Sequence, residues 1–346
     1  MAVLQRRWQN VWLLLLFLVL GSNIVLYHTQ LGNSVLVGAS NGVVIGSLID
    51  LVIVAPLLFL SYKKQKSFKQ LLFLMATGLI IARFVIPMNF LHPYVGITWV
   101  GFAVEAGLVL LEFILIVTLF MYLPKIMKAT KESTLPTIFA FPAAVDHYVK
   151  KHPIIHIVCS EMLMFYYALM SWRKKINESE QTLTLHKKSS YIALQIMLIH
   201  AIVIETLGIH WWLHDKSTIL SLVLLFLNVY SVIFLLADIQ AVRLSPVYVD
   251  ENKLYISLGL SKRMEIRWDE IEEVITDKEL LKQKLSKDTI DFVAKDFEEV
   301  FPNVILKLKR PKEATLVMGI KKPYQKVAIK FDDYQAVGEM LKKYSK

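Results

Sequence analysis

Histidine and glutamate residues occur at helical spacing in two apolar segments and suggest a metal site. In each segment two histidines are four positions apart, which places both imidazole rings on one side of a helix. Two such helices facing each other would offer nitrogen and oxygen ligands for a divalent ion. The six candidate ligands are His152, His156 and Glu161 in the first segment and Glu205, His210 and His214 in the second.

The ligand types favour iron or zinc, with Glu161 or Glu205 as a ligand, as an orienting group or as a base. If the two helices are antiparallel, all six residues fall near one membrane face. A second interpretation stays open, because His and Trp also gather at membrane interfaces, and each glutamate is about 140° around the helix from its nearer histidine. The sequence contains no H-E-x-x-H or C-x-x-C pattern typical of soluble metalloenzymes.

Charged residues also lie inside other apolar segments, where each charge needs a partner or a function. Arg83 lies near the end of one predicted span and Glu105 a similar distance after the start of the next. Adjacent antiparallel helices would place the two at nearly the same depth, so we expect an intramembrane ion pair. Glu112 shares a helix face with Glu105, and Asp50 reaches a similar depth to Glu112, so an ion or proton path is the alternative.

Basic residues are concentrated between residues 303 and 330, where only Glu313 opposes them. Beside a bilayer such an edge would attract anionic lipid headgroups, with about 1 kcal/mol per charge near the surface. An ordinary solvated face would have the same composition. The residues predicted to form this lipid-facing basic edge are Lys307, Lys309, Arg310, Lys312, Lys321 and Lys322.

The segments that carry these residues are predicted to be membrane-spanning helices. Of the 346 residues 55% are hydrophobic, and the mean hydropathy is +0.49, too apolar for an ordinary soluble enzyme. Nearly uncharged windows of about 20 residues, long enough to cross about 30 Å of hydrocarbon, recur up to residue 240. The predicted spans lie near residues 8–27, 35–60, 68–90, 96–123, 153–172, 189–213 and 216–240.

The net charge of +10 fits membrane orientation rather than nucleic-acid binding, because the basic residues of the helical part cluster in short loops. These loops place the N-terminus inside, and a further basic loop at 173–188 favours the inside as well. Seven crossings contradict this pattern, whereas an even number of crossings within 135–172 satisfies it. The segment containing Pro136 and Pro142 is therefore predicted to be interfacial or re-entrant, and the C-terminal domain to be cytoplasmic.

From Arg243 onward the hydrophobic pattern changes to period two, which is typical of half-buried strands. Strands are predicted around residues 254–258, 264–268, 304–308 and 327–331. Helices are predicted over 277–299 and from Asp332 to the C-terminus, where Val337, Met340, Leu341 and Tyr344 share one face. The predicted fold is an α-helical transmembrane bundle over residues 1–242, followed by a small soluble β-rich domain with a C-terminal helix over 243–346.

The stretch SPVYVDENKLYISLGLSKRMEIRWDEIEEV, residues 245–274, resembles the opening hairpins of bacterial pleckstrin-homology-like domains. The segments SEMLMFYYALMSWRKK, IHAIVIETLGIHWWLH and ADIQAVRLSPVYV are similar to Gram-positive bacterial multi-spanning membrane proteins of unknown function with such a tail. Some of those proteins are labelled beta-carotene 15,15'-monooxygenase. The resemblance covers about the last 200 residues. It implies a pleckstrin-homology-like tail and a place in the bacterial plasma membrane.

These features favour a non-enzymatic multi-pass protein whose helices anchor, sense or bind a small ligand. Its tail would dock to anionic lipid headgroups or to a protein partner. The alternative is a membrane-embedded, His-ligated metalloenzyme that acts on a lipid or isoprenoid, for example a carotenoid oxygenase. An ion or solute transporter is the third hypothesis, although no inverted repeat is evident in the sequence.

Overall fold

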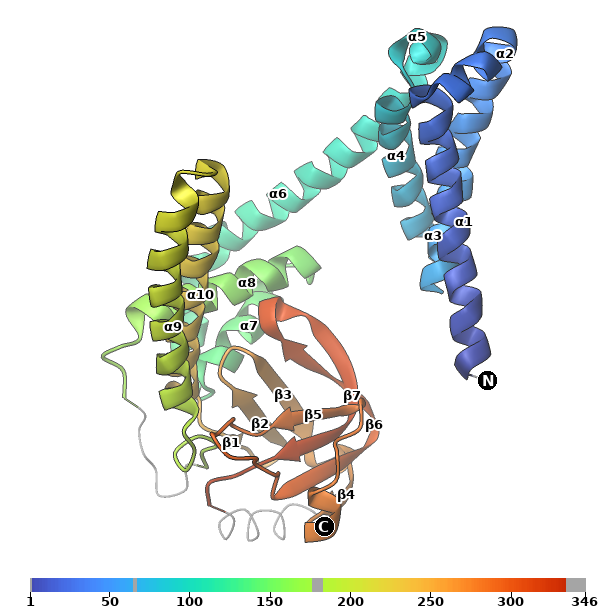
Figure 1. Ribbon diagram of the computed structural model, residues 1–346. Helices are drawn as coiled ribbons and strands as arrows, with labels where there is room; N and C mark the ends of the chain where they lie inside the picture. Colours follow the sequence, from blue (N-terminus) through green and yellow to red (C-terminus); the bar gives the residue numbers. More distant parts are fainter. Residues whose placement is uncertain (1, 65–66, 176–182, 334–346) are drawn as a thin grey trace. The chain divides into compact units, whose positions relative to one another are not determined.

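The computed structural model describes residues 2–64, 67–175 and 183–333 (Figure 1). Within these residues seven helices are long and apolar enough to cross a membrane, as the sequence predicts. They are Asn10–His28, Asn41–Lys63, Phe68–Val85, Met88–Glu132, Pro153–Met170, Tyr191–His214 and Thr218–Leu244. The chain forms two compact units, Met1–Ile114 and Leu115–Lys346.

The first unit consists of helices joined by short turns. Its elements are α1 (Ala2–His28), α2 (Gln30–Ile49), the π-helical turn η1 (Asp50–Val54), α3 (Ala55–Lys63), α4 (Phe68–Val85), α5 (Met88–Leu91), the 3₁₀ turn η2 (His92–Tyr94) and the beginning of α6 (Val95–Glu132). Helix α4 ends at Val85, because Pro87 favours an extended conformation at Ile86, whose φ and ψ are −89° and 118°. The predicted third span therefore ends earlier than residue 90.

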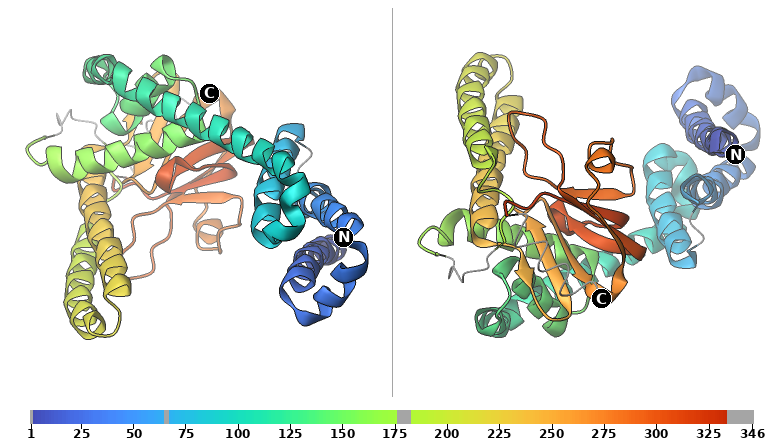
Figure 2. Two further views of the ribbon diagram at one scale, coloured as in Figure 1. Left: turned by 90° about the horizontal axis from the view of Figure 1, so that it is seen from above. Right: turned by 90° about the horizontal axis from the view of Figure 1, so that it is seen from below.

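In the described part of the second unit, four long helices follow α6 and precede the sheet. They are α7 (Thr137–Tyr148), α8 (Pro153–Phe165) with its π-helical continuation η3 (Tyr166–Met170), α9 (Tyr191–His214) and α10 (Thr218–Leu244). Helices α9 and α10 are antiparallel, and most of their apolar side chains are exposed or only partly buried, as expected of lipid-facing helices. Helix α8 lies across this pair near its base (Figures 1 and 2).

The strands form one mixed seven-stranded sheet in the order β1-β2-β3-β6-β7-β5, and β4 also pairs with β6. The strands are β1 (Tyr248–Val249), β2 (Lys253–Leu258), β3 (Lys262–Arg267), β4 (Ile271–Ile275), β5 (Thr289–Phe292), β6 (Val304–Leu316) and β7 (Lys321–Ile329). Leu254, Ile256, Met264, Ile266 and Leu306 are buried in one core, which confirms the predicted period-two strands. A small β domain thus follows the helices.

Two predictions for the β domain need correction. The segment 277–299 is not one helix, because only α11 (Lys278–Leu281) is helical and Thr289–Phe292 pairs with β7 in parallel. Ile290 and Phe292 are buried on either side of the exposed Asp291, so pairing with the sheet prevails over the helical pattern. The predicted C-terminal helix, with Val337, Met340, Leu341 and Tyr344, lies outside the described residues.

Strand β2 is buried on both faces, whereas the sequence predicts a half-buried strand. Leu254 and Ile256 face the sheet core, but Tyr255 and Ser257 are also buried. The ring of Tyr255 packs edge-on against Phe139 of α7, with 5.4 Å between the ring centroids. Helices α7 and α8 therefore cover the second face of β2 and β3, and both helices belong to the same compact unit as the sheet.

A buried carboxylate fastens α9 and α10 to the sheet. Asp238 of α10 is only 1% exposed. Its Oδ2 accepts hydrogen bonds from Tyr191 Oη at 2.7 Å and Gln195 Nε2 at 3.0 Å, and its Oδ1 accepts one from Leu260 N at 2.8 Å. Gly259 permits this approach, since its φ is +57° and an added Cβ would lie 2.1 Å from Asp238 Oδ1. We call these contacts the Asp238 clamp.

Replacing Asp238 with Ala should destabilise the second unit. The change leaves two buried donors, Tyr191 Oη and Leu260 N, and the part-buried Gln195 Nε2 without this acceptor, and each buried donor costs about 1–3 kcal/mol. We expect the free energy of unfolding to fall by about 3 kcal/mol or more, measured by thermal unfolding in detergent. Asp291→Ala is the matched control. Among the described residues the half-exposed Asp291 side chain pairs with Lys262 alone, at 2.6 Å, and its loss should cost about 1 kcal/mol or less. Equal losses in the two variants would refute the clamp.

Candidate functional site

The turn between β6 and β7 is an apolar hairpin tip that lies beside the membrane helices. The 3₁₀ turn η5 (Val317–Gly319) forms this tip, and Val317, Met318 and Ile320 expose 37%, 45% and 60% of their surface. The tip is seated closely on α8, because a Cβ added at Gly319 would lie 2.7 Å from the carbonyl oxygen of His156. Gly319 also has a φ of +73°, which disfavours other residues.

The hairpin tip and the two projecting helices form an apolar groove of about 400 Å³. Val317 and Met318 line it from the tip, Leu198 and Ile202 from α9, and Phe234 from α10. These helix residues belong to the part of α9 and α10 that carries exposed apolar side chains. The tip therefore lies alongside helix surface that is suited to lipid.

The structure divides the predicted basic edge into three groups. Lys307 and Lys312 form ion pairs with acids that precede or begin β4: Lys307 Nζ lies 3.0 Å from Glu272 Oε1, and Lys312 binds Glu270. The hydrogen bond from Lys307 to Glu272 raises the lysine's pKa above its ordinary value.

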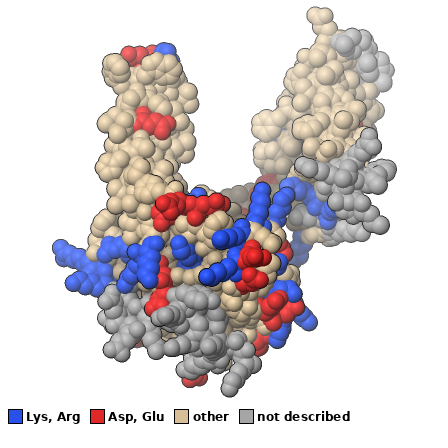
Figure 3. Space-filling view, turned by 60° about the horizontal axis from the view of Figure 1, so that its bottom comes forward, with Lys and Arg blue, Asp and Glu red and all other residues tan. Residues whose placement is uncertain are grey.

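Lys309 and Arg310 are exposed where the pairing of β6 with β7 is interrupted. Lys321 and Lys322 follow the hairpin tip directly, and Figure 3 shows Lys and Arg gathered around the base of the mainly uncharged α9 and α10 pair.

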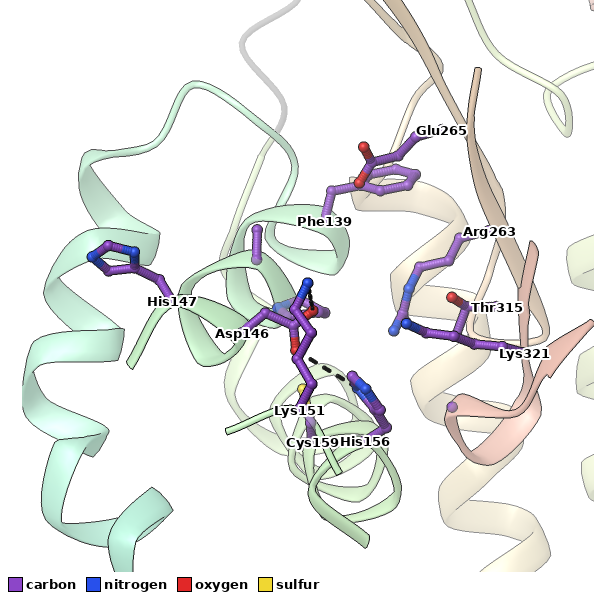
Figure 4. A pocket seen from close by; sticks show the side chains of 13 residues that line it. Phe139, Asp146, His147, Lys151, His156, Cys159, Arg263, Glu265, Thr315 and Lys321 are labelled. Atoms are coloured by element: carbon purple, nitrogen blue, oxygen red, sulfur yellow. Dashed lines mark ion pairs between the residues drawn. The ribbon is translucent and has the colours of Figure 1, made fainter. Parts of the chain in front are cut away.

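A polar cavity of about 430 Å³ lies between α7 and α8 on one side and the sheet on the other (Figure 4). Arg263 of β3, Thr315 of β6 and Lys321 of β7 line the sheet side. These three residues are cross-strand partners in one row, since Arg263 pairs with Thr315 and Thr315 pairs with Lys321. Their Cα atoms are therefore about 5 Å apart in succession. The helix side contributes Asp146, Lys151, His156 and Cys159.

The charges in this cavity are unevenly paired. Asp146 Oδ2 lies 3.6 Å from Lys151 Nζ, and its Oδ1 lies 3.8 Å from His156 Nδ1, too far for a hydrogen bond. Glu265, at the cavity edge, binds Lys253 at 3.2 Å. Within the described residues the Arg263 and Lys321 side chains have no hydrogen bond or ion pair. Burial lowers the pKa of the Arg263 guanidinium below its ordinary value, against the opposing charge of Glu265 and Asp146.

The six predicted metal ligands are divided among separate contacts. His152 caps α8, where its Nδ1 accepts a hydrogen bond from Ile154 N, and His156 faces Asp146 in the cavity. Glu161 accepts a hydrogen bond from Tyr230 Oη at 2.9 Å, and Glu205 is exposed on α9. His210 Nδ1 lies 2.6 Å from Ser221 Oγ, and the ring centroids of His210 and His214 are 5.5 Å apart.

The metal-site prediction assumed that α8 and α9 are antiparallel. The orientation of α8 instead separates the histidine pair of α8 from the pair His210 and His214 of α9. Helix α9 begins at the Asp238 clamp, so His210 lies about 28 Å away along its axis. His156 instead lies beside Gly319 at the β domain. Among the described residues no three His, Cys, Asp or Glu side chains are close enough to hold a metal ion. The structure therefore does not bring the six residues together, and metal binding stays a prediction.

The predicted ion pair between Arg83 and Glu105 is not formed within the described residues. The Arg83 guanidinium lies over the ring of Trp99, 4.4 Å from its centroid, and over Phe102 at 5.4 Å. Glu105 Oε1 accepts a hydrogen bond from Thr77 Oγ1 at 2.9 Å, and Asp50 Oδ2 accepts one from Asn23 Nδ2 at 3.3 Å. Because α4 ends at Val85, Arg83 lies at the depth of Trp99 on α6. Glu105 lies about one and a half helical turns farther along α6 than Trp99.

Sequence reasoning missed Arg263, Asp146 and Asp238. Arg263 follows a turn and resembles a solvated strand residue, and Asp146 lies in a segment interpreted only as interfacial. Asp238 offered a usable signal, since it is an acid near the end of an otherwise apolar predicted span. Arg263 and Thr315 are about fifty positions apart in the sequence, and only the register of the sheet brings them together.

Comparison of the chain with protein-family models, with curated proteins and with solved structures finds no match. The function is therefore argued from the side chains and their contacts.

Replacing Gly319 with Ala should loosen the hairpin tip from α8. The new Cβ would meet the His156 carbonyl, and a left-handed conformation costs a residue other than glycine about 1–2 kcal/mol. We expect a lower thermal midpoint and faster hydrogen exchange in the β6–β7 hairpin. Gly208→Ala on α9 is the control, because nothing lies within 4 Å of the added Cβ; it should not lower the thermal midpoint and should leave exchange in the hairpin unchanged. Unchanged hairpin exchange in Gly319→Ala would show that the contact does not hold the tip.

Proposed function

We propose that this chain is a non-enzymatic multi-pass membrane protein whose β domain docks to the lipid surface through the β6–β7 hairpin. The observation that carries the proposal is the position of Val317 and Met318 beside Leu198 and Ile202 of α9. Leu198 and Ile202 lie about 10–17 Å along the helix from its first residue, Tyr191. If α9 spans the bilayer, the tip enters the layer where hydrocarbon begins.

The charges next to the tip suit the same arrangement. Lys321 and Lys322 follow Gly319 by two and three residues, so they lie about 7–10 Å back along the strand. With the tip in hydrocarbon, these ammonium groups reach the level of the headgroup phosphates, where each contributes about 1 kcal/mol of attraction. The exposed apolar surface of Ile320, otherwise costly in water, would be covered by lipid.

The orientation of α8 supports a cytoplasmic β domain. Its first turn contacts the hairpin tip, and Tyr167 Oη at its far end lies 3.2 Å from Ser245 Oγ, just after α10. Both ends of α8 are thus near the β domain, although the helix is long and apolar enough to span. If α8 lies at the interface, six crossings remain, and the N-terminus and the β domain share the side favoured by the basic loops.

We also retain as proposals the pleckstrin-homology-like fold of the β domain and the bacterial plasma membrane as its location. Both come from the resemblance of residues 245–274 and of the three helical segments. The seven-stranded sheet is compatible with the proposed fold. Lipid docking is independent of that fold, because it depends on the hairpin alone.

An environment-sensitive dye at the hairpin tip tests lipid docking. In a Cys159→Ala background, Met318→Cys labelled with nitrobenzoxadiazole should show blue-shifted emission in proteoliposomes, and lipids carrying bromine in their chains should quench it. The matched control is Lys284→Cys, an exposed position beyond α11 at the opposite end of the sheet. Identical emission and quenching at the two positions would refute docking through the tip.

Fusion of reporters after Lys346 tests the topology. With six crossings, a green fluorescent protein fused there should fluoresce and an alkaline phosphatase fused there should be inactive in bacterial cells. The same pair of reporters fused after Asp215, in the α9–α10 connection, provides the internal control and should give the opposite result. An active phosphatase after Lys346 would mean that α8 crosses the membrane.

A further inference from the structure

The cavity between α7, α8 and the sheet has the features of an anion site. Arg263, Thr315 and Lys321 form one row across β3, β6 and β7 and all face the cavity. Figure 4 shows the Arg263 and Lys321 side chains converging beside Thr315. Arg263 and Lys321 flank Thr315 in this row, so their Cα atoms are about 10 Å apart and no acidic residue of the row lies between the two cations.

The carboxylates nearby do not neutralise this pair of cations. Asp146 is paired with Lys151 and lies near His156, and Glu265 is bound by Lys253. Lys151 and His156 face the Arg263 row from the opposite wall, so the ligand would meet nitrogen donors on both sides (Figure 4). The described part of the cavity therefore has unpaired positive charge and no unpaired negative charge of equal strength.

We propose that this cavity binds a phosphate monoester, held by Arg263 and Lys321 with Thr315 donating a hydrogen bond between them. A guanidinium fork, an ammonium and a hydroxyl fit the three oxygens of a dianionic phosphate, whereas a carboxylate offers one charge and two oxygens. The volume of about 430 Å³ lies within the usual range for small-molecule sites, so it holds more than a bare phosphate.

A second contact indicates what else the ligand carries. Asp146 Oδ1 is buried and accepts no hydrogen bond among the described residues. A hydroxyl group on the ligand would satisfy this oxygen while the phosphate lies against Arg263. sn-Glycerol 3-phosphate has this combination as a free molecule, and lysophosphatidic acid has it as a lipid headgroup. The proposal does not rest on insertion of the hairpin tip into lipid, since α7, α8, the sheet and Gly319 form the cavity within the protein itself.

Binding measurements on the full-length chain can distinguish a free phosphate ester from a lipid headgroup as the ligand. In detergent without added phospholipid, sn-glycerol 3-phosphate and inorganic phosphate are titrated by isothermal calorimetry. In nanodiscs of phosphatidylcholine, lysophosphatidic acid is compared with phosphatidylglycerol, which has the same net sign but a phosphodiester. Binding of the soluble ester identifies a free ligand, and preference for lysophosphatidic acid alone identifies a headgroup.

Substitutions test whether Arg263 and Lys321 hold the phosphate. Arg263→Gln and Lys321→Gln should each weaken the binding found in the wild type at least tenfold, and Lys321→Gln should fold normally because Lys321 is exposed. Lys326→Gln is the control, because Lys326 lies on the same strand opposite Lys307 and does not line the cavity; it should change binding less than twofold. The proposal is overturned if neither soluble phosphate nor lysophosphatidic acid binds, if Lys321→Gln binds like the wild type, or if Lys326→Gln loses as much.

Discussion

A carboxylate buried at the base of two apolar helices is stable only if hydrogen bonds replace the water it has lost. Asp238 obtains them from Tyr191 and Gln195 of α9 and from the backbone of Leu260 in the β2–β3 turn. Leaving a charge uncompensated there would cost several kcal/mol, so α9, α10 and this turn are held as one body. The membrane helices thereby determine where β3 begins, and the rest of the sheet is positioned from that strand.

The register of the sheet then determines where the cavity and the hairpin tip lie. Arg263, just after the clamped turn, pairs with Thr315 near the end of β6, and the hairpin tip follows within a few residues. Gly319 then seats the tip on α8. The cavity and the apolar tip are therefore neighbouring parts of one hairpin, with Lys321 in the cavity wall and Met318 beside α9.

The sequence was sufficient wherever one interaction dominates. Long apolar windows predict seven candidate spans, and period-two alternation predicts β2, β3, β6 and β7, because burial alone determines both patterns. The sequence was insufficient where tertiary contacts determine the secondary structure. Ile290 and Phe292 are an example, because the charged residues around them suggest a helix, whereas pairing with β7 makes them a strand. The predicted metal site depends on α8 being antiparallel to α9. The length and hydropathy of a segment do not show in which direction its helix runs.

Polar residues in the helices of the second unit are mostly paired with one another. Glu161 binds Tyr230, His210 lies beside Ser221, and Asn228 Nδ2 donates to Thr206 Oγ1 at 2.8 Å. Such pairs hold neighbouring helices together and do not require a ligand. Glu205 is instead exposed on α9. A polar residue inside an apolar segment is thus weak evidence for a site. Stronger evidence is a cavity in which folding places like charges together without an acid between them. The row of Arg263, Thr315 and Lys321 meets that criterion, because strand register brings two cations into one cavity with a threonine between them.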